Sequence, residues 1–245
     1  MKQSLLADVR IVLVEPSHPG NIGGVARAMK TMGLSDLALV NPGRFPDPQA
    51  EWRAAGAQDV LESARVYPSL DDALADRQWI VGTSTRARRI PWPVESAESV
   101  VGDLLRRLPR ARSAILFGRE TSGLSNDELQ RCNCHLVIPA NPEYPSLNLA
   151  MAVQVVCYEL CRQSQEAGDV VTAGWDRDPA SAAQTEALLE HFERVLVASG
   201  FLDASNPGQT MTRFRRLMTR FEFDEMEVQM LRGVLRKLAP AAAGD

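Results

Sequence analysis

The feature that most constrains the fold of this chain is an alternation of short apolar runs with segments of helical periodicity over its first two thirds. Uninterrupted apolar runs are typical of strands buried on both faces, and helices between such strands are typical of parallel sheets. The sequence therefore predicts an α/β domain built on a parallel sheet. The strand candidates are VRIVLV (9–14), LALV (37–40), ARVY (64–67), WIVGT (79–83), AILFG (114–118) and HLVIP (135–139).

The pattern changes after the apolar segment LNLAMAVQVVCYELCRQ (147–163). Residues 166–181 are polar, contain two glycines and one proline, and show no periodicity, which predicts a linker. Only helical periodicity returns in residues 182–245, so we expect a small helical domain there. The predicted organisation is an α/β domain at 1–165, a linker at 166–181 and a helical domain at 182–245.

Composition is that of an ordinary globular protein, with 245 residues, 45% of them hydrophobic, and a net charge of −4. No apolar run approaches the roughly 18 residues that a membrane span needs, and the first ten residues lack the apolar region of a signal peptide, so we expect a cytoplasmic protein without a membrane segment. Four cysteines are too few for a disulfide scaffold, and their spacings match zinc knuckles poorly. We therefore predict no metal site.

The segment VLVEPSHPGNIGGVARAMKTMG (12–33) leads from a predicted strand into a helix. We interpret Asn21 as the N-cap of this helix, and the apolar residues that follow it at helical spacing as a stripe facing the core. Gly23, Gly24 and Arg27 fall on the outward side. This arrangement predicts a ledge of bare backbone below a guanidinium, open to an anion or a sugar–phosphate. The alternative, an exposed arginine beside a tight turn, stays open.

Two later strands end in polar loops, the position where α/β proteins place ligands. In AILFGRETSGLSNDEL (114–129) the strand ends at Gly118 and Glu120 follows, while Ser125 and Glu128 have the spacing of a capping box. Glu120 is either a surface carboxylate or a site residue.

The second loop, in VIPANPEYPSLNLAMAVQ (137–154), follows a strand that ends at Ile138 and precedes a helix that we expect to begin near Ser146. Ser146 or Asn148 has the chemistry of a simple helix cap. The helix is so apolar that most of its circumference must be buried, in a core or against another subunit.

All but three of the 27 basic residues are arginine, the side chain best suited to phosphate. Each of three arginine clusters, taken alone, is read most simply as a solvated face. The cluster Arg86, Arg88 and Arg89 is the least ordinary, because it directly follows a predicted strand and is flanked by Trp92. The other two lie at 106–112 and 213–220.

Three segments, NIGGVARAMKTMG, LFGRETSGLSNDEL and PSLNLAMAVQ, together and in this order resemble the motifs of the SPOUT class of S-adenosylmethionine-dependent methyltransferases, in its ribose 2′-O branch. The resemblance covers essentially the whole chain. It implies a trefoil-knotted parallel-sheet domain, a homodimer, S-adenosylmethionine as cofactor and tRNA as substrate. It further implies methylation of a cytidine or uridine ribose at position 32, the first nucleotide of the anticodon loop.

The resemblance also implies roles for individual residues. Asn21 and Arg27 match the catalytic motif, Glu120 matches the acid of the second motif, and Asn148 belongs to the third. The three arginine clusters, among them Arg86, Arg88 and Arg89, become candidate tRNA contacts together with Trp92. The implied cofactor contacts are Thr83, Ser84, Thr85, Gly118, Ile138, Ser146, Leu147 and Asn148.

Other functions remain possible at this stage. A ribose methyltransferase of ribosomal RNA or of another tRNA position is the nearest alternative, and a non-catalytic RNA-binding homologue is a second. A nucleotide-dependent α/β enzyme is disfavoured, because the glycine spacing matches neither the dinucleotide fingerprint nor the phosphate loop of nucleoside triphosphatases.

Overall fold

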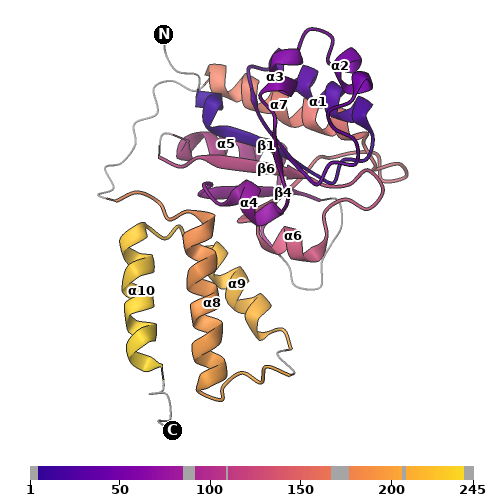
Figure 1. The fold of residues 1–245 in the computed structure, drawn as a ribbon. Coiled ribbons are helices and arrows are strands. Elements are labelled where there is room, and N and C mark those ends of the chain that lie inside the picture. Colours follow the sequence, from indigo (N-terminus) through magenta and orange to yellow (C-terminus); the bar gives the residue numbers. More distant parts are fainter. Residues whose placement is uncertain (1–4, 85–91, 109, 167–176, 206–207, 240–245) are drawn as a thin grey trace. The chain divides into compact units, whose positions relative to one another are not determined.

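A computed structural model describes most of the chain in two compact units, one within residues 1–173 and the other within 174–245. We describe each unit by itself (Figure 1). The described residues are 5–84, 92–108, 110–166, 177–205 and 208–239.

The first unit is built on a seven-stranded sheet in the order β3-β2-β1-β6-β4-β7-β5, in which every pairing is parallel. All six predicted strands are confirmed. The sequence analysis missed β5, because VES is short and partly exposed and so carries no apolar run. The strands are β1 (Val9–Val14), β2 (Asp36–Val40), β3 (Arg65–Tyr67), β4 (Trp79–Thr83), β5 (Val94–Ser96), β6 (Ser113–Phe117) and β7 (Cys134–Val137).

Helices cover both faces of this sheet, with α1, α2, α3, α5 and α7 on one side and α4 and α6 on the other (Figure 1). Burial on both faces is the reason why the central strands are apolar throughout. The helices are η1 (Leu5–Asp8), α1 (Pro19–Thr31), α2 (Pro48–Ala54), α3 (Gln58–Glu62), α4 (Leu70–Leu74), α5 (Ala97–Arg107), α6 (Asn126–Gln130) and α7 (Leu149–Glu166).

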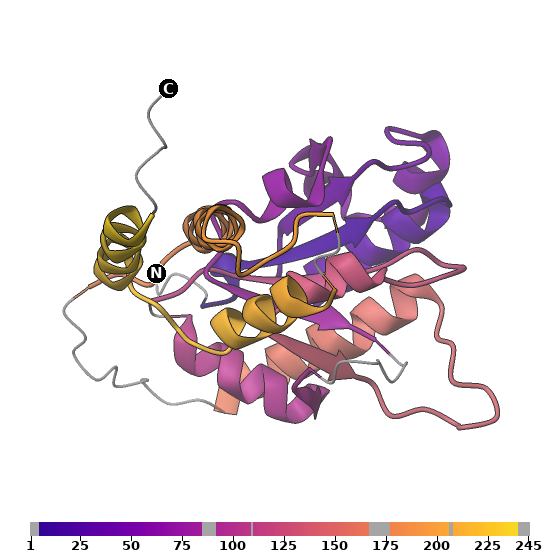
Figure 2. The ribbon, with the colours of Figure 1, turned by 90° about the horizontal axis from the view of Figure 1, so that it is seen from below.

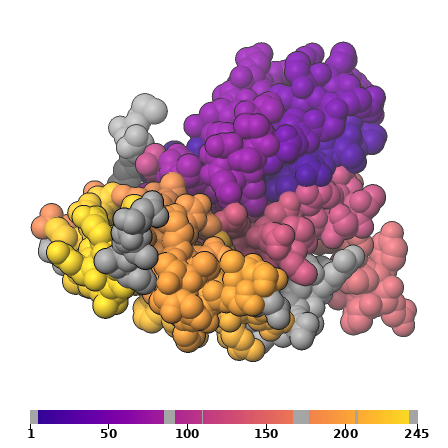
Figure 3. Space-filling model, turned by 60° about the horizontal axis from the view of Figure 1, so that its bottom comes forward, coloured from indigo at the N-terminus to yellow at the C-terminus, as the bar shows by residue number. Residues whose placement is uncertain are grey.

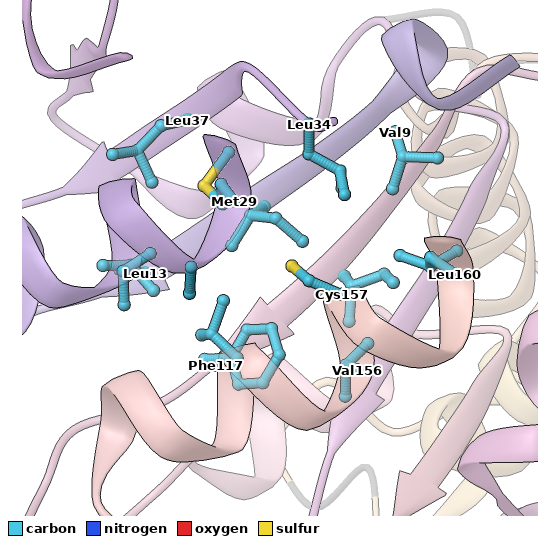
Figure 4. Packing of buried hydrophobic residues seen from close by; sticks show 14 of the residues in the cluster. Val9, Leu13, Met29, Leu34, Leu37, Phe117, Val156, Cys157 and Leu160 are labelled. Carbon is cyan, nitrogen blue, oxygen red and sulfur yellow. The ribbon is translucent and has the colours of Figure 1, made fainter. Parts of the chain in front are cut away.

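The main core lies between the sheet and the pair α1 and α7 (Figure 4). Leu13 and Phe117 reach it from β1 and β6, Met29 from α1, and Val156 and Leu160 from α7, all essentially without exposure to solvent. Burial of a side chain of this size contributes roughly 1.5–3 kcal/mol. The core thereby fixes the starts of α1 and α7 at one edge of the sheet.

The second unit is a small bundle of α8 (Ala182–Ala198), α9 (Thr210–Thr219) and α10 (Glu225–Leu238) around its own apolar cluster. Helices α8 and α10 each begin with a capping box, at Ser181 and Asp224. Backbone pairing joins the segment before α8 to the segment before α10, because Pro179 and Asp224 form an antiparallel bridge. Residues 178–181, predicted as the end of the linker, are therefore part of this unit.

Candidate active site

The carboxyl ends of β4, β6 and β7 lie side by side in the sheet and surround a cavity of about 440 Å³. A cavity of this size is typical of sites for small molecules. Part of its wall comes from the exposed segment that leads from β7 to α7, which projects from the body of the first unit (Figures 2 and 3). The lining residues are Thr83, Ser84, Phe117–Leu124, Leu136, Ile138, Pro145–Leu147, Leu149 and Ala152.

Most of the residues predicted to hold the cofactor line this cavity. Thr83 is held at the end of its strand, because its hydroxyl donates to the Leu116 carbonyl at 2.8 Å. Asn148 does not line the cavity, and Thr85 lies outside the described residues. The predicted residues found in the lining are Thr83, Ser84, Gly118, Ile138, Ser146 and Leu147.

Glu120 joins the cavity to the start of α1. One carboxylate oxygen accepts hydrogen bonds from the backbone N–H and the hydroxyl of Ser17, both at 3.1 Å. The other accepts from the backbone N–H of His18 at 3.2 Å and from Nδ2 of Asn21 at 3.0 Å. The carboxylate therefore satisfies N–H groups at a helix start from a loop about a hundred residues away in sequence.

These contacts determine the protonation state of Glu120. Desolvation by burial opposes ionisation, but the donors Asn21, Ser17 and His18 outweigh it and lower the pKa of Glu120 from 4.5 to about 2. A negative charge at the start of α1 is also favoured by the helix dipole. Glu120 is thus a fixed carboxylate and a very weak base at neutral pH.

Asn148 extends the same network to the start of α7. Its Nδ2 donates to Oδ1 of Asn21 at 3.0 Å, and its own Oδ1 accepts from the backbone N–H of Ala150 at 3.0 Å. Of the two caps considered for α7, Ser146 and Asn148, the structure therefore has Asn148. The helix begins at Leu149, three residues later than expected. The three predicted motifs meet through Glu120, Asn21 and Asn148.

The predicted cap of α1 is wrong. The helix begins at Pro19, and its N-cap is His18, whose Nδ1 accepts from the backbone N–H of Gly20 at 3.1 Å. Asn21 lies inside the first turn. Its amide is consequently free to bridge Glu120 and Asn148 instead of capping its own helix.

The predicted glycine ledge is also wrong, because the protein itself covers it. A Cβ atom on Gly23 would lie 2.1 Å from the carbonyl oxygen of Ala50 in α2, and one on Gly24 would lie 3.0 Å from Cβ of Ala150 in α7. Both glycines permit close helix packing and do not admit a ligand. Arg27 follows one turn later, exposed to solvent, and does not line the cavity of its own chain.

Comparison with family profiles and known proteins identifies relatives of this chain. Residues 8–158 match the profile of the SpoU rRNA Methylase family, and residues 183–245 match the C-terminal domain of the tRNA methyltransferase TrmJ. The chain is 47% identical over 237 residues to the tRNA (cytidine/uridine-2'-O-)-methyltransferase TrmJ of Cronobacter sakazakii. The aligned region covers 96% of this chain and 97% of that protein.

This chain belongs to the SpoU rRNA methylase family. Its fold is similar to that of TrmJ from Z. mobilis ZM4, with a TM-score of 0.80 and 35% identity over 94% of this chain and 98% of that one. AviRb of Streptomyces viridochromogenes, a SpoU methyltransferase crystallised with the cofactor AdoMet, has a TM-score of 0.52 and 25% identity over 64% of this chain and 61% of that one. The family expected from the three motifs is confirmed.

Sequence reasoning missed an ion pair that braces this SpoU site. Arg119 donates to both carboxylate oxygens of Glu15, at 2.8 and 2.7 Å, and to those of Glu128. Glu128 also completes the predicted capping box with Ser125, which is confirmed. The pair raises the pKa of Arg119 and ties the loop after β6 to the end of β1. The only signal for this ion pair in the sequence was an arginine next to Glu120, together with a glutamate at the end of the first predicted strand.

The predicted RNA contacts have different outcomes. Arg86, Arg88 and Arg89 lie outside the described residues. Trp92 is buried, donates from Nε1 to the Cys132 carbonyl at 2.9 Å and stacks on His135, so its prediction as an RNA contact is wrong. Within the described ranges, no three His, Cys, Asp or Glu side chains gather as a metal site would require. No described helix has the length and apolar character of a membrane span.

The role of Glu120 as a cap predicts a pH-dependent loss of stability. We expect Glu120→Gln to lower the free energy of unfolding at pH 7 by about 1 kcal/mol, because a neutral amide stabilises a helix start less well. The pKa of Glu120 is depressed in the folded state, so its stabilisation is complete above pH 4.5 and is lost as the pH falls toward 2. Urea unfolding of wild type and Glu120→Gln from pH 7 to pH 3 measures the difference between their free energies of unfolding, which should become smaller as the pH falls.

The control for this prediction is Glu62→Gln, which removes a carboxylate from an exposed helix end. It should leave the free energy of unfolding nearly unchanged at every pH. A difference between wild type and Glu120→Gln that stays constant down to pH 3 would contradict the proposed capping role.

Proposed function

We propose that this chain transfers a methyl group from S-adenosylmethionine to the ribose 2′-hydroxyl of a cytidine or uridine at position 32 of tRNA. The observation that carries the proposal is the connection of the cavity, through Glu120, to the amides of Asn21 and Asn148. The reaction named for the C. sakazakii relative supports the substrate and the atom that is methylated. With tRNA as substrate, we expect the protein to work in the cytoplasm, which cell fractionation would test.

The cavity fits the cofactor that we propose. Phe117, Leu136, Ile138 and Leu149 give it apolar walls for an aromatic base, while polar residues such as Thr121 and Ser122 line it from the loop after β6. The AdoMet complex of AviRb supports the choice of cofactor. When bound, the cofactor supplies an electrophilic methyl group on a sulfonium. The residues that would hold it are Thr83, Ser84, Gly118, Ile138, Ser146 and Leu147.

The reaction would join the 2′-hydroxyl oxygen to the methyl carbon as the carbon–sulfur bond breaks, with the hydroxyl proton passing to solvent. A hydroxyl is a weak nucleophile, so the protein must position it and stabilise the negative charge that develops on its oxygen. We assign the second task to Arg27, because a guanidinium offers a positive charge and several N–H donors and has no acceptor atom for a proton. Asn21, held on both sides by Glu120 and Asn148, is placed to orient the ribose.

Glu120 has a positioning role in this scheme. Both of its oxygens are occupied by donors from the protein, and its low pKa makes it a poor proton acceptor. It fixes the amide of Asn21. A single-stranded loop suits this site, because a ribose can be splayed out there, and the 2′-hydroxyl distinguishes RNA from DNA.

We further propose that the protein is a homodimer through α7. Met151, Val155 and Tyr158 recur at helical spacing on this helix and are 61%, 39% and 53% exposed, an apolar face that a second copy would cover. Since Arg27 does not line the cavity of its own chain, a second copy is also the available source of this group for each cavity. Sedimentation equilibrium should give twice the chain mass, and Met151→Glu with Tyr158→Glu should give monomers.

The test of function is transfer of labelled methyl to unmodified tRNA, to ribosomal RNA and to a tRNA with a 2′-deoxy nucleotide at position 32. We expect label only in the unmodified tRNA, at the ribose of position 32 after nuclease mapping. Label in ribosomal RNA or at another tRNA position would replace the proposed substrate. Tight RNA binding without cofactor binding in calorimetry would identify a non-catalytic homologue.

A further inference from the structure

Helices α8 and α10 of the second unit lie side by side and run in the same direction (Figure 1). Their starts are held in register, because Nε2 of Gln184 donates to Glu225 at 3.0 Å and the backbone N–H of Ala180 donates to the Phe223 carbonyl at 2.8 Å. Below these contacts, Leu188 of α8 and Val228 of α10 belong to the same buried cluster. The register fixed at the starts therefore continues along both helices.

Basic side chains follow two turns later. His191 and Arg232 stand seven residues beyond Gln184 and Glu225, so they occupy the same side of each helix two turns on. Arg194 and Arg236 come one turn further. Desolvation by burial and then the charges of Arg194, Arg232 and Arg236 lower the pKa of His191, so all three guanidinium groups act on its imidazole.

No acid of the described chain neutralises this cluster. Arg194, Arg232 and Arg236 form no ion pair or hydrogen bond with another described residue, whereas Arg215 of the same unit binds Glu186 at 2.7 Å. Nδ1 of His191 is buried and has no hydrogen-bond partner among the described residues. Three exposed like charges on neighbouring helices are unfavourable until an anion joins them.

Helix ends do not account for the arrangement. Cations are stabilised by the helix dipole only in the last turn, and Arg236 is the one member of the cluster that lies there. His191, Arg194 and Arg232 precede the last turns of their helices. The cluster therefore has the features of a binding site for an anion.

We propose that His191, Arg194, Arg232 and Arg236 bind a phosphate of the RNA backbone. The identity of the RNA as tRNA rests on the function proposed above. Guanidinium groups bind phosphate through two hydrogen bonds, and a protonated imidazole adds a charged donor. Because the chain has a net charge of −4, its attraction for RNA must come from local basic sites of this kind. The second unit thus holds the tRNA at a point on its backbone.

The first test follows the imidazole of His191 by NMR in the full-length protein. The chain has three histidines, and His191→Gln identifies the resonance. Saturating unmodified tRNA should raise the pKa of His191 by about one, because an anion favours the charged imidazole. Titration with inorganic phosphate alone should move the same resonance at millimolar concentration. A pKa of His191 that stays unchanged with saturating tRNA would overturn the proposal.

The second test measures tRNA affinity against salt concentration. We expect Arg232→Gln with Arg236→Gln to weaken binding about tenfold and to make the slope of log K against log salt shallower by about one, since the contact with one phosphate is lost. Arg232→Lys with Arg236→Lys keeps both charges and should retain most of the slope. Arg213→Gln in α9 with Arg220→Gln at its C-cap removes equal charge and should leave the response of His191 to tRNA intact. Wild-type affinity and slope in the α10 glutamine variant would contradict the proposal.

The outcomes separate this inference from the proposed function. Methyl transfer to tRNA with no response of His191 rejects the phosphate site and leaves the proposed function standing. A response of His191 to inorganic phosphate in a protein that neither binds nor methylates tRNA supports an anion site and rejects the function.

Discussion

Arg27→Lys should reduce methyl transfer to tRNA by a factor of about 100 to 1000 while binding of S-adenosylmethionine is preserved. Lysine keeps the charge of Arg27 but loses the planar fork that can contact a phosphate and the developing alkoxide together. Arg27 is exposed and does not line the cavity of its own chain, so the substitution should not disturb the cofactor. Single-turnover rates with labelled cofactor, together with calorimetry, measure the two effects separately.

The matched control is Lys30→Arg, one turn further along α1, where an exposed cation pairs with Asp59 at 2.8 Å. It should leave the rate unchanged. Equal turnover by Arg27→Lys and wild type would refute the role of the guanidinium in stabilising the developing charge. Weakened cofactor binding by Arg27→Lys would instead place this residue in the cofactor pocket.

Gly23→Ala is expected to lower the free energy of unfolding by about 3 kcal/mol or more, the upper range for overpacking. The added Cβ would stand 2.1 Å from the Ala50 carbonyl oxygen and 2.9 Å from Cβ of Arg53, so α2 must move away from α1. A backbone carbonyl cannot rotate aside as a flexible side chain does. Urea unfolding followed by circular dichroism measures the loss.

Gly233→Ala is the control, because a Cβ at this mid-helix glycine of α10 meets nothing within 4 Å. It should stabilise the protein by up to about 1 kcal/mol, the difference in helix propensity. The two glycines also distinguish packing from ligand binding. Normal stability of Gly23→Ala combined with loss of RNA binding would restore the ledge that the sequence predicted.

The outcome at Gly23 shows where sequence reasoning stops. Spacing along a helix indicates which residues share a face, and it correctly put Ile22, Val25 and Met29 in the core. It does not indicate what lies against the opposite face. Bare backbone is equally suited to a ligand and to a neighbouring helix, and α2 follows only after β2 and a long loop. The pairing of α1 with α2 had no local signal.

The order of the strands shows the same limit. Apolar runs identified six strands, but β6 lies between β1 and β4, and β7 lies between β4 and β5. Periodicity carries no information about such insertions, and the trefoil knot was expected only because of the family resemblance. The site was predicted better, since loops at the ends of adjacent parallel strands necessarily converge. Of the network residues, Ser17 and His18 were missed: their backbone N–H contacts with Glu120 leave no side-chain pattern, and the cap of α1 was assigned to Asn21 instead of His18.

The contact of the Glu120 carboxylate with the start of α1 has a consequence for how the protein is made. Glu120 is synthesised 99 residues after Asn21, so the start of α1 leaves the ribosome long before its acceptor exists. During this interval the N–H groups of Ser17 and His18 have only water to bind. A nascent chain that has not yet placed β6 therefore lacks the network that Glu120 organises at the start of α1.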